Sequence, residues 1–133
     1  MKVVILGCGR VGAYLAKSLT ADGHQVTMID SNRVSLSRLG DDFPGEVVIG
    51  TGIDEDVLNQ AGIKEADAFV AVTNGDNTNV MAAQVAKEVF GVPRVICRIY
   101  DPLRAEFYTS LGLETICPTL MGANAIKKGL LEK

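Results

Sequence analysis

The feature that most constrains the fold is a glycine-rich stretch, residues 7–12, which directly follows a short run of apolar, mostly β-branched residues at 3–6. Such a run is typical of a strand buried on both faces of a sheet. After the glycines, apolar side chains recur at Val11, Leu15 and Leu19, the i, i+4, i+8 spacing of one helix face. The stretch therefore predicts a strand, a tight turn and a helix that begins at the glycines.

Each glycine of this GxGxxG pattern has its own physical role. Gly7 permits the tight turn, Gly9 lets a phosphate approach the backbone, and Gly12 lets the helix pack closely on the strand. The helix would direct its free N–H groups and the positive end of its dipole at an anion. Asp30 stands 18 residues beyond Gly12, at the end of the next predicted strand, where a carboxylate can accept both ribose hydroxyls and repels a 2′-phosphate. We expect a dinucleotide or nucleotide site here; the alternative is a purely structural glycine turn.

Strand-like and helix-like patterns alternate six times along the 133 residues. The alternation predicts an α/β fold: a Rossmann-type, doubly wound parallel sheet of about six strands in the order 3-2-1-4-5-6, with helices on both faces. We expect a single domain over 1–133, because the length suits one core and no linker or repeat interrupts it. The expected strands are 3–6, 25–29, 46–49, 68–72, 94–99 and 114–117, and the expected helices run from the glycines to 22, then over 31–41, 54–62, 77–90, 101–112 and about 119–133.

Apolar side chains mark the expected inner faces of two later helices. The helix over 101–112 carries Leu103, Phe107 and Leu111 at the spacing of one face. The helix over 77–90 is expected to bury Val80, Met81, Val85, Val89 and Phe90.

Composition excludes several classes of function. A net charge of −3 offers no basic surplus to neutralise a phosphate backbone, so we expect no nucleic-acid partner. No apolar run approaches the ~18 residues of a membrane span, and the chain opens on a predicted strand, so we expect neither direct membrane insertion nor a signal peptide. The cysteines, Cys8, Cys97 and Cys117, are odd in number and lack CxxC spacing, which indicates a reducing cytoplasm without a disulfide framework or zinc site.

In a doubly wound sheet, ligands bind at the carboxyl ends of the strands, near the switch point between the first and the fourth. The residues placed there are rich in hydrogen-bonding groups for ribose, adenine and phosphate, and poor in acid–base groups. The candidate cofactor-binding residues are Gly7, Cys8, Gly9, Arg10, Val11, Gly12, Asp30, Ser31, Gly50, Thr51, Gly52, Thr73, Asn74, Asn77 and Arg98.

Three of these candidates also have simpler explanations. Arg10 could bond a phosphate, although a lone arginine in the first turn of a helix is more often solvated surface. Asn77 opens a predicted helix, so N-capping explains it about as well as ligand contact does. Arg98 emerges at the ligand edge of a strand, and an ion pair with Asp101 or Glu106 is the alternative to phosphate recognition.

We expect no catalytic residues. The only histidine, His24, lies in the turn before the second strand, at the opposite edge of the sheet. Tyr14 and Lys17 lie on the first helix, one residue short of a Tyr-x-x-x-Lys spacing. Cys8, near a helix N-terminus, should have a lowered thiol pKa, which leaves redox sensing open beside the simpler role of a small residue in the loop. The rival hypothesis is a small NAD-dependent oxidoreductase, but no sequence is left to build its second substrate site.

Taken together, the motifs resemble the N-terminal nucleotide-binding domain of RCK proteins, the regulators of potassium conductance, in particular the TrkA-N type found in Trk/Ktr potassium-uptake regulatory subunits. The resemblance covers nearly all of the chain. It rests on the glycine motif with Arg10, on Asp30, on 66–73 with Asp76 and Asn79, on 92–96 with Arg98, and on the closing Leu111, Gly112 and 118–123.

The resemblance implies a cytoplasmic ring of such domains, which binds NAD(H), ATP or ADP and transmits that occupancy to a potassium-translocating membrane protein. It implies that Asp30 binds ribose and that Arg10 reaches phosphate, sometimes across a subunit interface. Thr51 stands where many members have a carboxylate near adenine. Thr119 follows Pro118 where many have a glutamate that in some supports a divalent cation. We therefore expect no metal site.

The resemblance also bears on assembly. Members usually carry a second, C-terminal regulatory subdomain, and this sequence stops before it. Relatives use the equivalent of the last predicted helix, about 119–133, to cross over to a neighbouring subunit. The apolar residues of this helix do not fall on one narrow stripe, so some apolar surface would remain exposed. We expect a homodimer or a higher ring, held at the inner face of the cell membrane by its partner.

Overall fold

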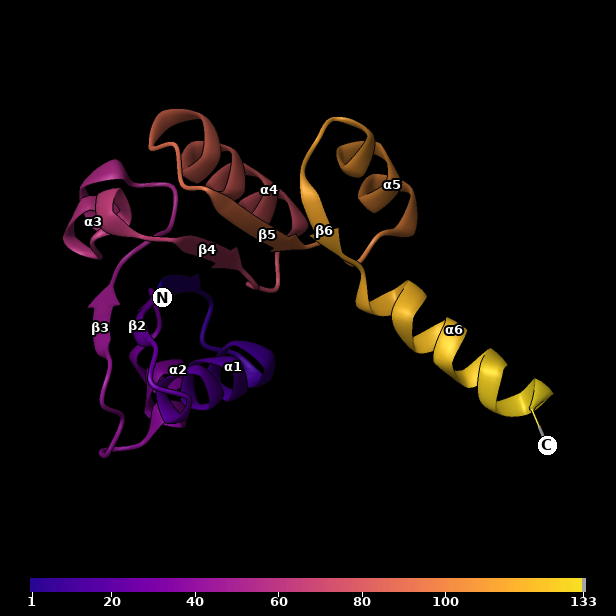
Figure 1. Cartoon of the computed structure of the whole chain (residues 1–133), viewed down its shortest axis with the longest axis horizontal. Helices are drawn as coiled ribbons and strands as arrows, with labels where there is room; N and C mark the ends of the chain where they lie inside the picture. The colour runs from indigo at the N-terminus through magenta and orange to yellow at the C-terminus, as the bar shows by residue number, and fades with distance from the viewer. Residues whose placement is uncertain (133) are drawn as a thin grey trace.

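The computed structural model describes residues 1–132. Its centre is one sheet of six parallel strands in the order β3-β2-β1-β4-β5-β6 (Figure 1). This order confirms the doubly wound sheet expected from the alternating pattern. The strands are β1 (Lys2–Leu6), β2 (Gln25–Asp30), β3 (Glu46–Ile49), β4 (Ala68–Ala71), β5 (Arg94–Arg98) and β6 (Glu114–Ile116).

Helices flank the sheet on both faces, as expected. The helices are α1 (Arg10–Ala21), α2 (Arg33–Leu36), α3 (Glu55–Gln60), α4 (Asp76–Gln84), α5 (Pro102–Ser110) and α6 (Pro118–Leu131). Helices α1 and α2 lie on one face, and α3, α4 and α5 lie on the other (Figure 1). Short 3₁₀ turns follow α2 (Ser37–Leu39) and α3 (Ile63–Glu65), and a π-helical turn (Val85–Val89) continues α4. Across residues 1–132, no helix combines the length and apolar character needed to cross a bilayer.

Strand β1 is buried on both faces, as its unbroken apolar sequence predicts. Val4 and Leu6 belong to the core beneath α3 and α4, whereas Val3 and Ile5 belong to the core beneath α1. Alternate side chains of β1 thus pack into the cores on the two faces of the sheet. This packing fixes the position of the loop that follows β1.

The second helix is shorter than predicted. Asn32 caps it as expected, accepting hydrogen bonds from the N–H groups of Val34 and Ser35. The α-helix ends at Leu36, and the Ser37 hydroxyl donates to the carbonyl of Val34, a local bond that competes with helical pairing. The chain then leaves through Gly40 at φ +80°, so the helix expected over 31–41 is only one turn of α-helix and one of 3₁₀-helix.

The faces that pack against the sheet are made of smaller residues than predicted. In α4 and the turn after it, Met81 and Val89 are 51% and 58% exposed, and the burial expected for them is wrong. Alanines instead lie against the sheet, together with Val80. Leu103 and Phe107 of α5, Leu111 just after it and Val11 of α1 are likewise exposed. The buried alanines of these helices are Ala13, Ala16, Ala82, Ala83, Ala86 and Ala105. Alanine faces bring helix backbones close to the sheet, and the larger side chains are left at the margins.

Helix α6 extends away from the domain (Figure 1). No residue of its span is buried, although it carries Leu120, Met121, Ile126 and Leu130. The exposed apolar surface expected for this helix is therefore present along its whole length.

Two glycines of the first loop serve the packing roles assigned to them. Gly7 adopts φ +109°, a left-handed conformation that side chains disfavour. A Cβ on Gly12 would lie 1.8 Å from the carbonyl oxygen of Gly7, closer than any two unbonded atoms can approach. By contrast, a Cβ on Gly9 would meet nothing within 4 Å. Gly12 is thus required for α1 to pack on β1, whereas Gly9 borders open space.

We expect Gly12→Ala to lower the free energy of unfolding by about 1–3 kcal/mol, because α1 must move off β1 to admit the methyl group. Gly9→Ala is the matched control and should change stability by no more than about 0.5 kcal/mol, since the position is open and extended. Urea denaturation of the two variants checks this. Equal stability of both variants would show that the Gly12 contact does not limit the packing of α1.

Candidate functional site

A cleft of about 770 Å³ opens at the carboxyl ends of the strands, across the switch point between β1 and β4. The predicted candidates that line it come from five strand ends: Gly7, Gly9, Arg10, Val11, Asp30, Ser31, Gly50, Thr51, Gly52, Thr73, Asn74 and Arg98. Cys8, Gly12 and Asn77 do not line it. The cleft also includes eight residues outside the list of candidate cofactor-binding residues: Leu6, Asn32, Ser35, Arg38, Val72, Gly75, Thr78 and Tyr100.

The N-terminus of α1 faces this cleft. Gly9 is its N-cap residue, and no side chain of residues 1–132 caps the N–H groups of the first turn. Unpaired N–H groups and the helix dipole together favour an anion at such a position. The open space beside Gly9 is where a phosphate could approach the backbone.

Asp30 connects the loops after β1 and β2. One carboxylate oxygen accepts a hydrogen bond from the Cys8 N–H at 2.7 Å, and the other accepts one from the Asn32 N–H at 2.8 Å. Each oxygen keeps a free lone pair, so the carboxylate is held in place and can still accept a hydroxyl.

Arg38 is a cleft residue that sequence reasoning missed. Its Nη1 donates to the Cys8 carbonyl oxygen at 3.2 Å, which brings a cation to the Asp30 side of the cleft. Arg38 lies in the irregular turn after α2, where no periodic pattern could reveal which way its side chain points.

Cys8 is fully buried, and the lowered thiol pKa expected for it is wrong. Burial raises the pKa of the Cys8 thiol, and the nearby Asp30 carboxylate raises it further, whereas Arg38 and Lys17 lower it. The loss of solvation is the largest of these effects, because Cys8 packs in the core beneath α1. A buried thiol with a raised pKa is unsuited to redox sensing.

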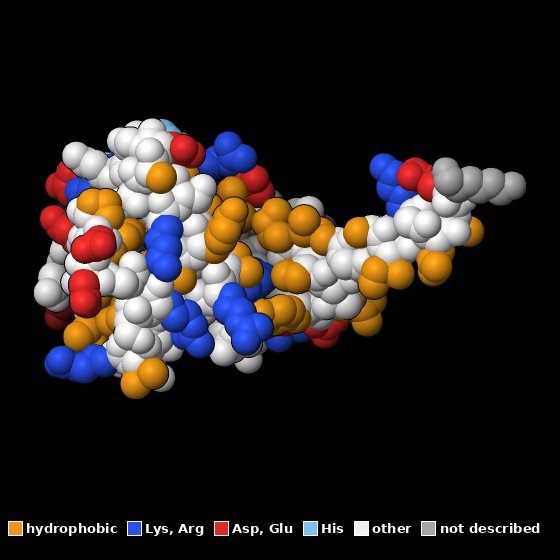
Figure 2. Space-filling model, turned by 90° about the horizontal axis from the view of Figure 1, so that it is seen from below, with side chains coloured by type: hydrophobic (Ala, Val, Ile, Leu, Met, Phe, Trp, Pro, Cys, Tyr) orange, Lys and Arg blue, Asp and Glu red, His pale blue; other side chains and the backbone are white. Residues whose placement is uncertain are grey.

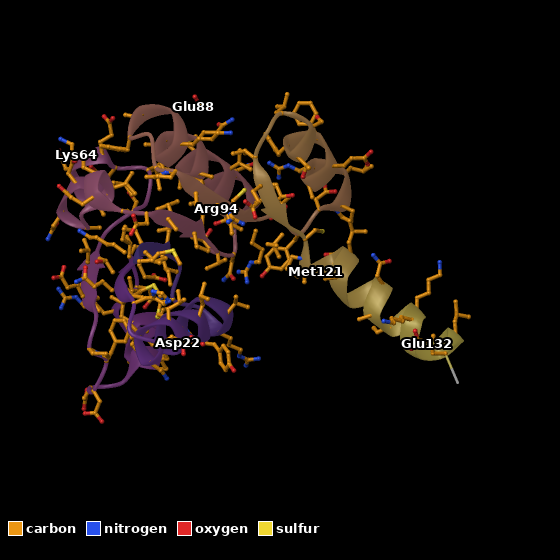
Figure 3. The ribbon with its side chains drawn as sticks, in the orientation of Figure 1. Asp22, Lys64, Glu88, Arg94, Met121 and Glu132 are labelled. Atoms are coloured by element: carbon orange, nitrogen blue, oxygen red, sulfur yellow. The ribbon has the colours of Figure 1, made fainter. Side chains whose placement is uncertain are left out.

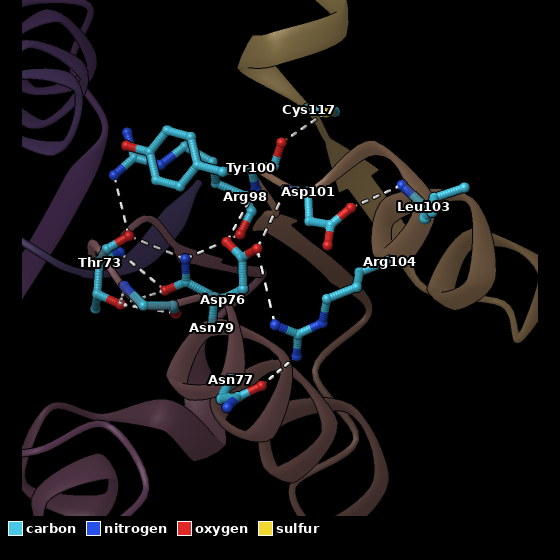
Figure 4. A network of polar contacts seen from close by, with 11 residues as sticks. Thr73, Asp76, Asn77, Asn79, Arg98, Tyr100, Asp101, Leu103, Arg104 and Cys117 are labelled. Carbon is cyan, nitrogen blue, oxygen red and sulfur yellow. Dashed lines mark hydrogen bonds and ion pairs between the residues drawn. The ribbon is translucent and has the colours of Figure 1, made fainter.

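A buried asparagine organises the other side of the cleft (Figure 4). The Asn79 Oδ1 accepts hydrogen bonds from the Thr73 N–H at 2.8 Å and the Thr73 hydroxyl at 2.7 Å. Its Nδ2 donates to the carbonyl oxygens of Thr73 at 3.0 Å and Arg98 at 2.9 Å. All four bonding positions of the amide are therefore used, and they hold the end of β4 against the end of β5.

Arg98 is only 7% exposed. Its Nη2 donates to the carbonyl oxygens of Val72 at 2.8 Å and Thr73 at 3.0 Å, and the guanidinium lies 4.8 Å from the centre of the Tyr100 ring. In the part of the chain that the structure describes, its Nε has no hydrogen-bond partner. Within residues 1–132, no carboxylate forms an ion pair with Arg98, so the expected alternative, a pair with Asp101 or Glu106, is not what the structure shows.

The acidic and amide groups near the start of α4 bind other protein groups. The Asp76 carboxylate accepts hydrogen bonds from the N–H groups of Tyr100 and Asp101 at 2.9 and 3.2 Å, and it lies 3.9 Å from Arg104. The Asn77 side-chain oxygen accepts from Arg104 as well (Figure 4). Asn77 therefore contacts α5 and stands outside the cleft. Among the residues described, no group of three His, Cys, Asp or Glu side chains is placed to hold a metal ion.

The strand order and the position of the cleft define the class of protein: this is a Rossmann-type domain with its candidate site at the switch point of the sheet. The model of the TrkA-N domain family matches residues 3–118. The chain therefore belongs to the TrkA-N family, which confirms the family resemblance.

Individual relatives agree with this assignment. The chain is 50% identical over 131 residues to the Trk system potassium uptake protein TrkA of Streptomyces coelicolor, covering 98% of this chain and 59% of that protein. It thus spans about three fifths of the length of that relative.

Two solved structures share the fold. One is the Kef C-terminal domain of Shewanella denitrificans in its AMP-bound form, with a TM-score of 0.83 and 23% identity, covering 100% of this chain and 83% of that chain. The other is the GsuK RCK domain, with a TM-score of 0.80 and 25% identity, covering 94% of this chain and 27% of that chain.

We expect the thiols of the native protein to react slowly with DTNB at pH 8. All three cysteines are buried, and burial raises the pKa of Cys8 and brings that of Cys97 to about 11, so little thiolate exists at this pH. Unfolding in urea should release all three thiols to rapid reaction. One fast-reacting thiol in the native protein would contradict this account of Cys8.

Proposed function

We propose that this chain is the nucleotide-binding regulatory domain of a potassium-uptake system. It binds NAD(H), or alternatively ATP or ADP, and its occupancy controls potassium movement through a membrane protein with which it associates. The domain works at the inner, cytoplasmic face of the cell membrane and reaches it through that partner. The observation that carries the proposal is the Asp30 carboxylate, fixed by two backbone N–H groups beside an uncapped helix N-terminus.

The ligand's adenosine diphosphate part matches the two halves of the cleft. Asp30 accepts the ribose hydroxyls, and the phosphates lie over Gly9 and the start of α1, within reach of Arg10. Across the switch point, the guanidinium of Arg98 supplies a further cation. The remaining lining residues, Ser31, Gly50, Thr51, Gly52, Thr73 and Asn74, supply hydroxyl, amide and backbone groups around this frame.

The comparisons support this proposal. The Streptomyces relative is named as a Trk system potassium uptake protein, and the Kef domain structure has AMP bound. We carry the potassium-uptake role and the adenine-nucleotide ligand from these proteins to this chain as parts of the proposal.

A regulatory role is favoured over catalysis. The ionisable side chains of the cleft are three arginines, one carboxylate and one phenol, a set without histidine that suits the phosphates and ribose hydroxyls of a nucleotide better than general acid–base catalysis: Arg10, Arg38, Arg98, Asp30 and Tyr100. His24 contacts the amino group of Met1 at 3.0 Å, at the opposite edge of the sheet. The rival, a small NAD-dependent oxidoreductase, predicts NADH turnover with common substrates, and we expect none.

Ligand class provides the direct test. By titration calorimetry, we expect NAD⁺ to bind more tightly than NADP⁺, because the Asp30 carboxylate repels a 2′-phosphate. Asp30→Ala should weaken NAD⁺ binding by about 1–3 kcal/mol, the range for hydrogen bonds to a charged group. Asp54→Ala is the matched control, since Asp54 also accepts a backbone N–H but lies outside the cleft. Tighter binding of NADP⁺ to the wild type, or no binding of adenine nucleotides, would contradict the proposal.

An uncovered apolar groove supports the expected assembly. On the α1 side of the sheet, Val70 of β4, Ile96 of β5 and Ile116 of β6 face an open apolar groove beside α1. Its far rim is the base of α6, at Pro118 and Met121. Figure 3 labels Met121 at this base and Arg94 on β5. Figure 2 shows apolar side chains along the underside of the molecule and out along α6. Parallel sheets are normally covered on both faces, so this face requires a partner.

The occupant we propose for this groove is α6 of a second copy of the chain. The groove is continuous with the base of α6, and the helix has exposed apolar side chains along its length. A two-fold axis beside that base would place each α6 in the groove of the other copy, an isologous pairing that covers both grooves at once. The homodimer is the smallest unit of this kind, and a higher ring can be built from it.

We expect the protein to be a dimer at micromolar concentration by light scattering. Ile126→Asp should shift it to a monomer that keeps the fold of the sheet, because Ile126 is 66% exposed and belongs to no core of the isolated chain. Lys127→Asp is the control: it introduces the same side chain about 100° around the helix. A wild type that stays monomeric with NADH or ATP present would show that α6 does not seat on a second copy.

A further inference from the structure

The nucleotide cleft and the apolar groove share a wall. Val11, Val72 and Arg98 line both cavities. Val11 and Val72 are apolar and carry no charge that could respond to a ligand. Arg98 therefore holds the only charged side chain common to the two cavities among the residues described.

The environment of Arg98 leaves its charge unbalanced. The side chain follows Arg94 and Ile96 on the groove face of β5, and its guanidinium reaches the carbonyl oxygens of Val72 and Thr73 at the cleft. Carbonyl dipoles and the Tyr100 ring face the cation, but within residues 1–132 no carboxylate pairs with it and its buried Nε has no hydrogen-bond partner. A buried cation without a counter-charge is unfavourable, and removing its last contact with water increases the cost.

We propose that Arg98 couples the two cavities: a diphosphate in the cleft supplies the counter-charge that lets α6 of a second copy close over the groove. This inference rests on the proposed function. When the cleft is empty, docking of α6 desolvates an unpaired guanidinium and is disfavoured. When an adenosine diphosphate group occupies the cleft, its negative charge offsets that desolvation, and the dimer is favoured.

Such coupling acts in both directions. If the ligand tightens the dimer by a given factor, dimerisation must tighten the ligand by the same factor. The shared chemistry is the diphosphate, which ADP and NAD⁺ both carry, so both should act and adenosine should not. Arg94 provides an internal comparison, because it lines the groove but not the cleft and is paired on the surface with Glu114 at 2.8 Å.

The test is the dimer dissociation constant of the 133-residue chain, measured by sedimentation with ADP, with NAD⁺, with adenosine and without ligand. We expect ADP and NAD⁺ to tighten the dimer about 5- to 150-fold, the usual range of coupling between sites, and adenosine to leave it unchanged. Arg98→Met removes the charge at similar length, so this variant should dimerise equally well without ligand and at ligand concentrations that calorimetry shows to saturate the variant itself. Arg98→Lys should restore the dependence, and Arg94→Met should retain it in full.

The outcomes separate this inference from the function on which it rests. Calorimetry that detects neither ADP nor NAD⁺ on the wild type overturns the proposed function. If the ligands bind but the dimer constant stays the same, or if Arg98→Met keeps the wild-type dependence, the coupling is wrong and the proposed function stands. If Arg98→Met fails to fold, the wild type alone provides the test. Its affinity for ADP must be higher at protein concentrations above the dimer dissociation constant than below it, by the same factor by which ADP tightens the dimer.

Discussion

The close approach of α1 to β1 is the contact on which the rest of the structure depends. Gly12 lies so near the Gly7 carbonyl that no side chain can stand between them, and the first helix is thereby locked to the central strand. Because the N-terminus of α1 is the anion-binding element, this packing contact also sets where a phosphate can lie. On the opposite face, alanines likewise allow a close approach of helix and sheet, where α4 packs on β4 and β5.

Two polar side chains turn the loops around the switch point into a fixed frame. Asp30 joins the loops after β1 and β2, and Asn79 joins the ends of β4 and β5. Both act on backbone groups, so the geometry of the cleft depends little on the side chains that line it. A ligand entering such a frame needs little rearrangement of the protein, which lowers the entropy that binding must overcome.

Local sequence patterns were sufficient for the topology, because the alternation of elements and the GxGxxG spacing report on backbone geometry. They also located Gly7, Asp30 and ten other residues of the cleft, since all parallel strands end at one edge. Sequence patterns failed for properties that depend on contacts between residues far apart in the sequence. Met81 was expected to be buried because it is hydrophobic. In the structure the helix lies so close to the sheet that the packed positions are held by alanine. The direction of the Cys8 pKa and the lack of an acidic partner for Arg98 likewise depend on neighbours remote in sequence.

The exposed course of α6 has a consequence for its own order. A helix of 14 residues, none of them buried, has little beyond local propensity to hold it, and a length near ~12–15 residues is marginal in water. Gly122 and Gly129 weaken it further, at about 1 kcal/mol each relative to alanine. Folding of this segment is therefore linked to what it touches. The helix content of α6 should therefore rise with protein concentration. The conformational entropy that the segment loses on becoming helical would be part of the cost of bringing two copies together.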